Sequence, residues 1–462
     1  MTLMMPTSED ATTLDTFRAR VVRHPDRLAL EELAAGGARR DAQLTWREWH
    51  ELSTRVARAL IRDGVQRGDS VAILAGNRNL WPIAELGILM AGAVSVGVSG
   101  DDAQIAFEVG DCHAVAAIVD TTSNLQKLMA HRGELPALRI IVCEDGASNG
   151  ARWWGEWLDD SMATDTPLPD AAPDDLALLV YGSSPSGERR AARITHRCIT
   201  ASTASAGKVL ALGEQDCAVS VLPYSDAEER VLGLHLRIRC GMSVAHVADE
   251  RTLWRAAGAI DATVLIGQAS HYETLYQSLL AHERTLGNDD RGAWTSAITL
   301  GRERVALRRA GEPVPDPIEA RWRIAMTPSR AARQLLGATL RVTTARGAPL
   351  AGEVADHLAA MGIVVRGGYG PVEHICATMQ PPDDCARDSG APMPGTELRI
   401  GDDRGVLVKR SALTFAGYHE RPSATRDAFT SDGLWLRTGR RGELLPNGHL
   451  RLDASHQPAA GE

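Results

Sequence analysis

The segment SVAILAGNRNLWPIAELGILMAGAVSV, residues 70–96, alternates between two structural patterns. Its first part, SVAILAG, is a short apolar run that is typical of a buried strand. The part that follows, WPIAELGILMAGAVSV, is long enough for an apolar helix that leads into a second strand. The run AVAAIVD at 114–120 repeats the strand pattern. Strands that alternate with helices indicate parallel βαβ units, so this segment predicts an α/β fold.

The same alternation extends to both sides of this segment. LTWREWHELSTRVARALIRDG, residues 44–64, has apolar residues at spacings of three and four and predicts an amphipathic helix. From about residue 396 to 452, short strands separated by GDDRG, SDG and PNG indicate a small β-rich subdomain. A second series of predicted strands lies between these regions, at 176–182, 218–224, 242–247, 262–267 and 363–370.

These patterns predict three segments along the chain. We expect an α/β subdomain over residues 1–165, a second α/β subdomain over 166–390, and a small β-rich subdomain with a tail over 391–462. Both α/β subdomains are expected to contain mainly parallel sheets. The stretch 147–175 is rich in Pro, Asp and Gly and predicts a surface connection.

Composition narrows the classes of partner and site. The net charge is −9, which does not favour nucleic acid or an anionic membrane surface as a partner. No apolar run is long enough for a membrane span, and the N-terminus lacks the basic region of a signal peptide. The seven cysteines are scattered without a CxxC pair, which predicts free thiols in the cytoplasm and no metal site.

Six segments carry a resemblance to a known family, in the family's order along the chain. They are NRNLWPIAELGILMAGAVSV (77–96), VSVLPYSDAEERVLGLHLRIRCG (219–241), TVLIGQASHYETLY (263–276), VTTARGAPL (342–350), GGYGPVEHICAT (367–378) and FAGYHERPSATRDAFTSDGLWLRTG (415–439). Together they resemble the adenylate-forming superfamily, most nearly the long-chain acyl-CoA synthetases, over about residues 14–452. The resemblance implies the fold of that superfamily's large N-terminal domain. It also implies that the C-terminal lid domain, with its catalytic lysine, is absent from a chain that ends at residue 462.

The phosphate-binding loop of the superfamily corresponds to YGSSPSGERRA, residues 181–191. Ser183, Ser186 and Gly187 keep the hydroxyls and the flexible backbone that such a loop needs. Pro185 removes a backbone donor, and Glu188 places a carboxylate where the family has a lysine. This degenerate nucleotide loop either retains weak phosphate binding or serves only as a connection.

The motif GYGPVEH keeps Tyr369 and Glu373, and the resemblance assigns Glu373 as the magnesium carboxylate. Val372 replaces a threonine that contacts phosphate. His374 is a candidate acid or base, or an ordinary loop histidine. Arg440 replaces the aspartate that would hold the ribose hydroxyls, so the chemistry there changes from acceptor to donor. It could bind a carboxylate or simply lie on the surface.

A third group of candidates lies in LPYSDAEER and GQASHYETLY. Asp226 occupies the family's histidine position, and the neighbouring carboxylates could divide acid and base roles or form a solvated helix start. We therefore predict Asp226, Glu373 and His374 as catalytic residues. The predicted substrate-binding residues are Tyr224, His271, Tyr369 and Arg440.

The lost ATP contacts lead to three hypotheses for function. In the first, the chain binds and transforms a small acyl- or aryl-type carboxylic acid without ATP, as in secondary metabolism. In the second, it is a non-catalytic binding or scaffold protein, as a homodimer or beside an active homologue. In the third, it is an acyl-AMP ligase whose C-terminal domain comes from a partner. No cofactor is expected, because binding of ATP and magnesium should be weak or absent.

Overall fold

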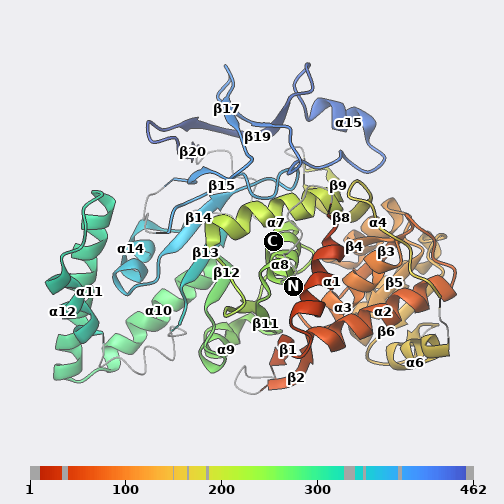
Figure 1. Ribbon diagram of the computed structural model, residues 1–462, viewed down its shortest axis with the longest axis horizontal. Helices are drawn as coiled ribbons and strands as arrows, with labels where there is room; N and C mark the ends of the chain where they lie inside the picture. Colours follow the sequence, from red (N-terminus) through yellow and green to blue (C-terminus); the bar gives the residue numbers. More distant parts are fainter. Residues whose placement is uncertain are drawn as a thin grey trace.

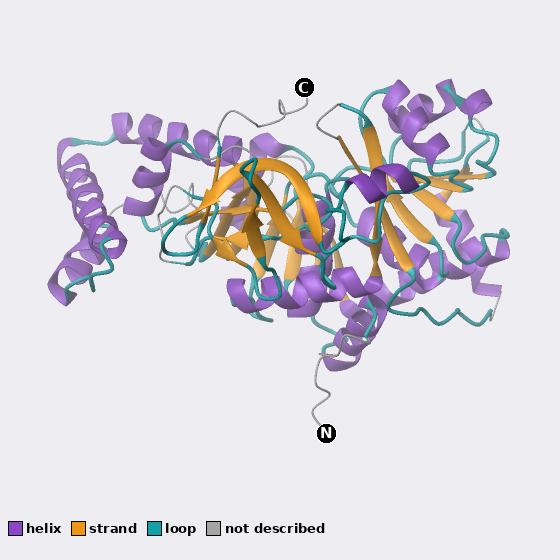
Figure 2. Ribbon diagram, turned by 90° about the horizontal axis from the view of Figure 1, so that it is seen from above, coloured by secondary structure: helices purple, strands orange, loops and turns teal. Residues whose placement is uncertain are grey.

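The computed structural model contains two large sheets and one small sheet (Figure 1). The large sheets lie side by side, and the small sheet lies above them in Figure 1. Viewed from above, helices flank the strands of both large sheets (Figure 2). The structure describes residues 11–33, 40–148, 150–163, 166–183, 187–326, 339–346, 350–382 and 388–453.

The seven-stranded sheet has the order β7-β6-β5-β3-β4-β8-β9. All its neighbouring strands are parallel except β8 and β9, which form an antiparallel pair. Its strands are β3 (Ser70–Leu74), β4 (Val94–Gly97), β5 (Ala116–Val119), β6 (Ile140–Cys143), β7 (Arg152–Trp153), β8 (Leu176–Ser183) and β9 (Arg189–Thr195). Its helices are α2 (Trp46–Arg62), α3 (Leu80–Met90), α4 (Asp102–Asp111), α5 (Thr122–Ala130) and α6 (Trp154–Asp159).

The nine-stranded sheet has the order β16-β15-β14-β13-β12-β10-β11-β1-β2, with a parallel centre and antiparallel edges. Its strands are β1 (Leu28–Leu33), β2 (Arg40–Thr45), β10 (Cys217–Ser220), β11 (Ser243–His246), β12 (Val264–Gln268), β13 (Val342–Arg346), β14 (Val365–Tyr369), β15 (Thr378–Met379) and β16 (Ala391–Pro392). Its helices are α1 (Thr13–Arg23), α7 (His196–Leu210), α8 (Leu236–Cys240), α9 (Leu253–Ala259), α10 (Ala269–Thr285), α11 (Asn288–Arg309), α12 (Asp316–Ala325) and α14 (Gly352–Ala360).

The small sheet is antiparallel, as the turn signals predict. Its strands are β17 (Leu398–Ile400), β18 (Gly405–Lys409), β19 (Trp435–Leu444) and β20 (Leu450–Leu452), and α15 (Pro422–Asp427) lies in the connection before β19.

Local sequence explains why the predicted elements form where they do. Thr45 and Glu48 form a capping box at the start of α2, in which Glu48 accepts from the Thr45 N–H at 2.8 Å. All five residues of β3 are buried, as expected for a strand covered on both faces. The expectation of two parallel-rich α/β subdomains is confirmed, and so is the amphipathic helix at 44–64.

Two details differ from the predicted segments. The sheets cross the predicted boundary at residue 165, because β1 and β2 join the nine-stranded sheet while β8 and β9 join the seven-stranded one. The stretch 147–175 is more than a surface connection, since it contains β7 and α6. Trp157 in α6 is fully buried, and its Nε1 donates to Asp63 at 2.7 Å. Tertiary burial of this tryptophan outweighs the turn-like composition around it.

A buried ion network joins α3 to the segment 229–235, which forms a π-helical turn. Glu85 is the one charged residue of α3, and its carboxylate lies 2.8 Å from Arg230 and 3.0 Å from His235. Arg230 also donates to the Ser95 hydroxyl at 2.8 Å and to the Leu179 carbonyl at 3.2 Å. These bonds satisfy groups that would otherwise be costly to bury, and they fix the turn that borders the candidate site.

Candidate functional site

A small cavity lies at the carboxyl ends of β13 and β14. Ligands of open α/β sheets bind at this edge, outside the carboxyl ends of parallel strands. Thr344, Tyr369 and Leu232 contribute to its walls, and its volume is about 20 Å³. That volume holds about one water molecule. Glu228, which is 4% exposed, brings a carboxylate to the same cavity from the residue before the π-helical turn.

Two glycines of the GGYG motif allow the chain to pack closely beside this cavity. A Cβ on Gly370 would lie 2.2 Å from the Ile375 carbonyl oxygen, and one on Gly368 would lie 2.9 Å from the Thr378 carbonyl oxygen. Neither contact is tolerated by a larger residue. The motif therefore sets the position of Tyr369, which lies between these two glycines.

Glu373 is held by an aromatic hydroxyl. The hydroxyl of Tyr418 donates to Oε1 of Glu373 at 2.5 Å. Burial raises the pKa of Glu373, although the Tyr418 bond and nearby Arg190 act in the opposite direction. The guanidinium of Arg190 lies over the Tyr418 ring at 5.6 Å and pairs with Glu188 at 2.6 Å. One chain of contacts thus runs from Glu188 to Glu373.

The described residues of the predicted nucleotide loop lie at the end of β8 and the start of β9, which pair antiparallel. Gly187 has a φ of +81°, the left-handed conformation that glycine adopts readily. A Cβ on Gly182 would lie 3.3 Å from Cγ1 of Val372, which places the loop strand against the GYGPVEH motif. Ser186 and the side chain of Ser183 lie outside the described residues, so the hydroxyl roles predicted for them remain predictions.

The other arginines beside this loop are also paired with carboxylates. Arg189 donates to Glu108 at 3.0 Å through Nε, and Arg421 pairs with Asp111 at 2.7 Å. A triphosphate that approaches this loop would have to compete with these internal ion pairs.

Tyr369, which lines the small cavity, lies near enough to Arg440 for the charge of Arg440 to act on its hydroxyl. Burial raises the pKa of the Tyr369 hydroxyl, while Thr438 and the positive charge of Arg440 act in the opposite direction. The backbone N–H of Arg440, on β19, donates to the Thr438 hydroxyl at 3.3 Å. A phenol and a guanidinium at one edge of the cleft are donors suited to a carboxylate.

Tyr224 lies in the core rather than in this cavity. It is 1% exposed and stacks on Trp81 with ring centroids 5.7 Å apart. His246 lies 3.0 Å from the Asn79 side-chain oxygen through Nδ1 and 2.8 Å from the Tyr224 hydroxyl through Nε2. Because the Asn79 oxygen only accepts, Nδ1 carries the proton and the Tyr224 hydroxyl donates to Nε2. A structural role explains Tyr224 better than ligand contact.

His374 is fully buried, and both of its ring nitrogens are occupied. Nδ1 lies 3.3 Å from the Thr414 hydroxyl, and Nε2 lies 2.9 Å from the Thr396 hydroxyl. Burial lowers the pKa of His374 to about 4, so the ring is neutral near pH 7. The carboxylate of Asp226 accepts instead from the Glu228 N–H at 2.8 Å, at the start of the π-helical turn. Asp226 and His374, two of the three predicted catalytic residues, thus have different hydrogen-bond partners.

His271 caps a helix. Its Nδ1 accepts from the Gln268 N–H at 3.0 Å, and its Nε2 lies 2.7 Å from Glu250. Burial lowers its pKa, and Glu250 acts in the opposite direction. His271 therefore stabilises the start of α10, and it is not among the residues that line the small cavity.

Two residues that hold the site in place, Tyr418 and Glu85, were not predicted from the sequence. Tyr418 was not identified as the partner of Glu373, because no sequence pattern links residues 45 positions apart. Glu85 was missed as well, although one charged residue inside an otherwise apolar helix is a signal for a buried ion pair. Among the described residues, no group of His, Cys, Asp and Glu side chains could hold a metal ion, and no helix combines the length and apolarity needed to cross a membrane.

Comparison with known proteins adds a family match. Residues 17–419 match the model of the AMP-binding enzyme family. The long-chain-fatty-acid–CoA ligase FadD15 of Mycobacterium bovis is 28% identical over 421 residues, which cover 86% of this chain and 66% of the relative. The peroxisomal long chain acyl-CoA synthetase 6 of Arabidopsis thaliana is 25% identical, with 88% and 61% covered. The chain thus spans less than two thirds of the length of either relative.

Solved structures agree on the fold. The N-terminal domain of FACL13 from Mycobacterium tuberculosis superposes with a TM-score of 0.76 at 19% identity, covering 96% of this chain and 99% of that one. The anthranilate CoA ligase AuaEII, solved with anthranoyl-AMP, gives a TM-score of 0.75 at 18% identity, covering 96% and 77%. The architecture expected from the sequence, that of an adenylate-forming N-terminal domain, is confirmed.

Proposed function

This chain belongs to the family of AMP-binding enzymes, and from that premise we propose that it binds a small acyl- or aryl-type carboxylic acid without efficient ATP-dependent adenylation. The binding site is the cleft at the carboxyl ends of β13 and β14. The second hypothesis of the sequence analysis, a non-catalytic binding protein, is the one that the geometry favours.

The observation that carries this proposal is the chain of contacts from Glu188 to Glu373. Glu373 is the carboxylate that the resemblance assigns to magnesium, yet the Tyr418 hydroxyl binds it at 2.5 Å. Arg190 is a cation of the nucleotide loop, yet it pairs with Glu188 at 2.6 Å. A phosphate–magnesium complex would have to compete with both interactions, and Glu188 would repel the phosphate.

The ligand's carboxylate is proposed to meet Arg440 and the hydroxyl of Tyr369. Charge-assisted hydrogen bonds from a guanidinium suit a carboxylate better than they suit ribose hydroxyls. The cavity of about 20 Å³ holds only about one water molecule, so binding of even a small acid requires its walls to move, and the flexible side chain of Met379 is the part of the wall best suited to yield.

The first hypothesis contains two claims, that the chain binds a small acid and that it transforms this acid without ATP. The geometry supports the second claim less than the first. Proton transfer needs groups within about 3 Å of a common atom, directly or through one water. His374 uses both ring nitrogens on threonine hydroxyls. Glu373 and Tyr418 remain the pair of titratable groups that any such reaction would use.

A second candidate function is ordinary acyl-CoA ligation. It is supported by the names of the relatives, which are long-chain fatty acid–CoA ligases and acyl-CoA synthetases. If the chain is such a ligase, phosphate would bind to a conformation in which the ion pair between Glu188 and Arg190 is rearranged. The third hypothesis above, an acyl-AMP ligase whose C-terminal domain comes from a partner, is one form of this candidate.

Two further points belong to the proposal. We place the protein in the cytoplasm, since the six cysteines among the described residues are free thiols. Association as a homodimer or with an active homologue would fit a binding or scaffold role.

Calorimetric titration with Mg-ATP, AMP and a panel of small aliphatic and aromatic acids tests the proposal. The expected result is binding of at least one acid and no measurable binding of Mg-ATP below about 1 mM. Formation of an acyl-adenylate with release of pyrophosphate would refute it and establish the ligase candidate. An Arg440→Gln variant should lose acid binding, because the amide cannot replace the charge.

A further inference from the structure

A wide cavity of about 580 Å³ lies between α1, the last turn of α7 and the end of α8. These three helices lie side by side near the centre of Figure 1. The lining residues at 212–215 and 239–240 come shortly before β10 and β11, so the cavity lies at the amino ends of these strands. The candidate functional site lies at the opposite edge of the sheet, because β10 to β14 are parallel. The two sites share no lining residue.

Cations outnumber carboxylates in the lining of this cavity. The lining contains Arg20, Arg23, Lys208 and Arg239, with Glu214 as its one carboxylate among the described residues. We call it the basic cavity. The whole chain has a net charge of −9, so this is a local reversal of sign. A cleft lined by one sign of charge raises the local concentration of ions of the opposite sign.

Glu214 does not neutralise these cations, because several groups share its carboxylate. Arg20 lies 2.7 Å from it, Arg23 lies 3.0 Å from it and His24 lies 2.8 Å from it. Arg27 adds a further guanidinium at 3.7 Å. One carboxylate balances one positive charge, so positive charge remains at the end of α1 for a ligand to neutralise.

Two of the cations have side chains that a ligand can reach. Lys208 is exposed in the last turn of α7, and no carboxylate among the described residues lies within ion-pair distance of it. The side chain of Arg23 is 39% exposed. It binds Glu214 through Nε, which leaves its two terminal nitrogens to donate.

Arg20 has a different role, because it is 2% exposed. Its guanidinium donates to Glu214 at 2.7 Å and to the carbonyls of Ile238 and Arg239 at 3.2 and 2.6 Å. Arg20 therefore holds the wall in place. Burial lowers the pKa of Arg20 and of Arg239, although Glu214 acts in the opposite direction on Arg20. An anion in the cavity would stabilise both charged forms.

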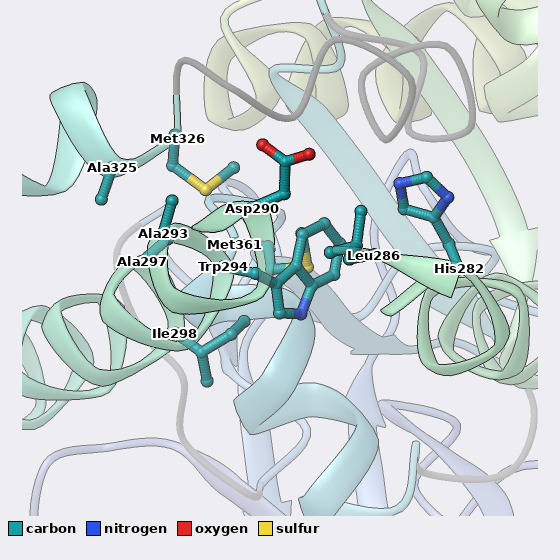
Figure 3. Close-up of a pocket in the computed structure, with 10 residues that line it drawn as sticks. All are labelled: His282, Leu286, Asp290, Ala293, Trp294, Ala297, Ile298, Ala325, Met326 and Met361. Carbon is teal, nitrogen blue, oxygen red and sulfur yellow. The ribbon is translucent and has the colours of Figure 1, made fainter. Parts of the chain in front are cut away.

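The pocket drawn in Figure 3, between α10, α11 and α12, has a different character. Its lining residues are mainly apolar, and none of those that the structure describes there is a lysine or an arginine. Its walls therefore offer no permanent cation to an anionic ligand, whereas those of the basic cavity offer several.

We propose that the basic cavity binds a phosphate group carried by a small molecule, with Lys208 and Arg23 as the donors. A phosphate group carries up to two negative charges near pH 7 and three acceptor oxygens, so it can take bonds from several cations at once. The volume lies within the range of about 300–1,000 Å³ that is typical of small-molecule sites. The site is independent of the proposed function, which uses the opposite edge of the sheet.

The first test uses inorganic pyrophosphate without magnesium as the probe and phosphorus NMR line broadening on the full chain. Binding should weaken as salt is added, because the donors are exposed charges. Lys208→Gln should weaken it about tenfold, the value of one charge-assisted hydrogen bond. Lys127→Gln is the matched control, since it removes a lysine from the last turn of another helix, α5, and should leave binding unchanged. No binding by the wild type at several millimolar pyrophosphate overturns the proposal, and so does equal binding by Lys208→Gln.

A second variant distinguishes the basic cavity from the predicted nucleotide loop. Arg190→Gln removes the cation of that loop and should leave pyrophosphate binding unchanged. Arg23→Gln should weaken binding, with a thermal midpoint measured alongside because Arg23 also binds Glu214. If binding is lost in Arg190→Gln and kept in Lys208→Gln, the phosphate binds at the loop and the proposal is wrong.

A third test identifies what carries the phosphate group, since a soluble phosphate ester and a lipid headgroup offer the same chemistry. Sedimentation with phosphatidylcholine vesicles, with and without phosphatidic acid, separates the two sources. Sedimentation that requires phosphatidic acid and is lost in Lys208→Gln assigns a lipid headgroup. Pyrophosphate binding without sedimentation assigns a soluble phosphate ester. A chain that binds neither pyrophosphate nor these vesicles has no phosphate site at the basic cavity.

Discussion

The hydroxyl of Tyr418 lies 2.5 Å from the carboxylate of Glu373, and this bond ties the GYGPVEH motif to the connection between β18 and β19 of the small antiparallel sheet. Arg190 comes from a third part of the chain, β9, and its guanidinium lies over the Tyr418 ring. Together these contacts join three parts of the chain beside the predicted nucleotide loop.

Removing this hydroxyl should destabilise the protein. Tyr418→Phe leaves a buried carboxyl without its donor, which typically costs about 1–3 kcal/mol. Urea unfolding at pH 7 measures the change. In a Glu373→Gln background the same substitution should cost less, because the charge it serves is gone. Equal losses in both backgrounds would show that the hydroxyl does not act through Glu373.

Glu85 should matter more than any surface carboxylate. Burial alone would raise its pKa, but Arg230 and His235 together lower the pKa to about 2. Glu85→Gln leaves Arg230 buried without a counter-charge, and breaking such a pair typically costs about 3–5 kcal/mol. Because the folded-state pKa lies below the unfolded value, this stabilisation is present above about pH 4.5 and is lost as the pH falls towards 2.

The exposed Glu51, on α2, provides the control for that experiment. Glu51→Gln should change the free energy of unfolding, measured in urea, by less than about 0.5 kcal/mol. If Glu85→Gln behaves like Glu51→Gln, the buried network does not stabilise the fold.

The fold was largely predictable from the sequence, because strands such as β3 and β5 are short apolar runs between helices. The site was less predictable. Tyr369 and Arg440 were both predicted to bind substrate, and this role stays a prediction, although the charge of Arg440 acts on the Tyr369 hydroxyl. The environments of Tyr224 and His374 were not predicted. Whether a polar side chain faces a cavity or a buried hydroxyl depends on tertiary packing, which motif spacing does not encode.

Gly370 should not tolerate a side chain. Gly370→Ala would place Cβ 2.2 Å from the Ile375 carbonyl oxygen, and backbone on both sides prevents relief. We expect a loss of several kcal/mol or failure to fold, seen as a lower thermal midpoint or insoluble expression. Gly213→Ala is the matched control, because nothing lies within 4 Å of the position that a Cβ would take there, and it should fold normally. A normal midpoint for Gly370→Ala would contradict the packing of the GGYG motif.

Glu144 should make stability depend on pH. Burial raises its pKa to about 7, with Arg78 opposing and the carboxylates of Glu32, Asp120 and Asp145 adding to the shift. The folded state therefore binds more protons than the unfolded state between about pH 4.5 and 7. Stability contributed by the neutral form is present below about pH 4.5 and falls as the pH rises through 7.

Glu144→Gln should make the free energy of unfolding fall less steeply with pH. The slope should change by an amount that corresponds to less than one bound proton per molecule. Chemical unfolding at pH 5, 6 and 7 gives the slope directly. Glu303→Gln changes an exposed carboxylate on α11 and should leave the slope as it is. An unchanged slope in Glu144→Gln would assign the pH dependence to other groups.

The last prediction concerns ATP. In the wild-type chain, Glu188 pairs with Arg190 at 2.6 Å, Val372 offers no donor, and Arg440 cannot accept from ribose hydroxyls. The combined variant Glu188→Lys, Val372→Thr and Arg440→Asp restores the residue types that the resemblance associates with nucleotide binding. It should bind Mg-ATP more tightly than the wild type.

Thermal shift with about 1 mM Mg-ATP measures the gain, because a ligand that binds only the folded state stabilises it by RT ln(1+[L]/Kd). A dissociation constant of about 0.1 mM would give about 1.4 kcal/mol. Glu188→Gln alone is the intermediate control, since it removes the repulsion without adding a cation, and it should give little or no shift. Clear stabilisation of the wild type at micromolar ATP would sink the proposal, because the Glu188–Arg190 and Tyr418–Glu373 contacts would then not obstruct the nucleotide.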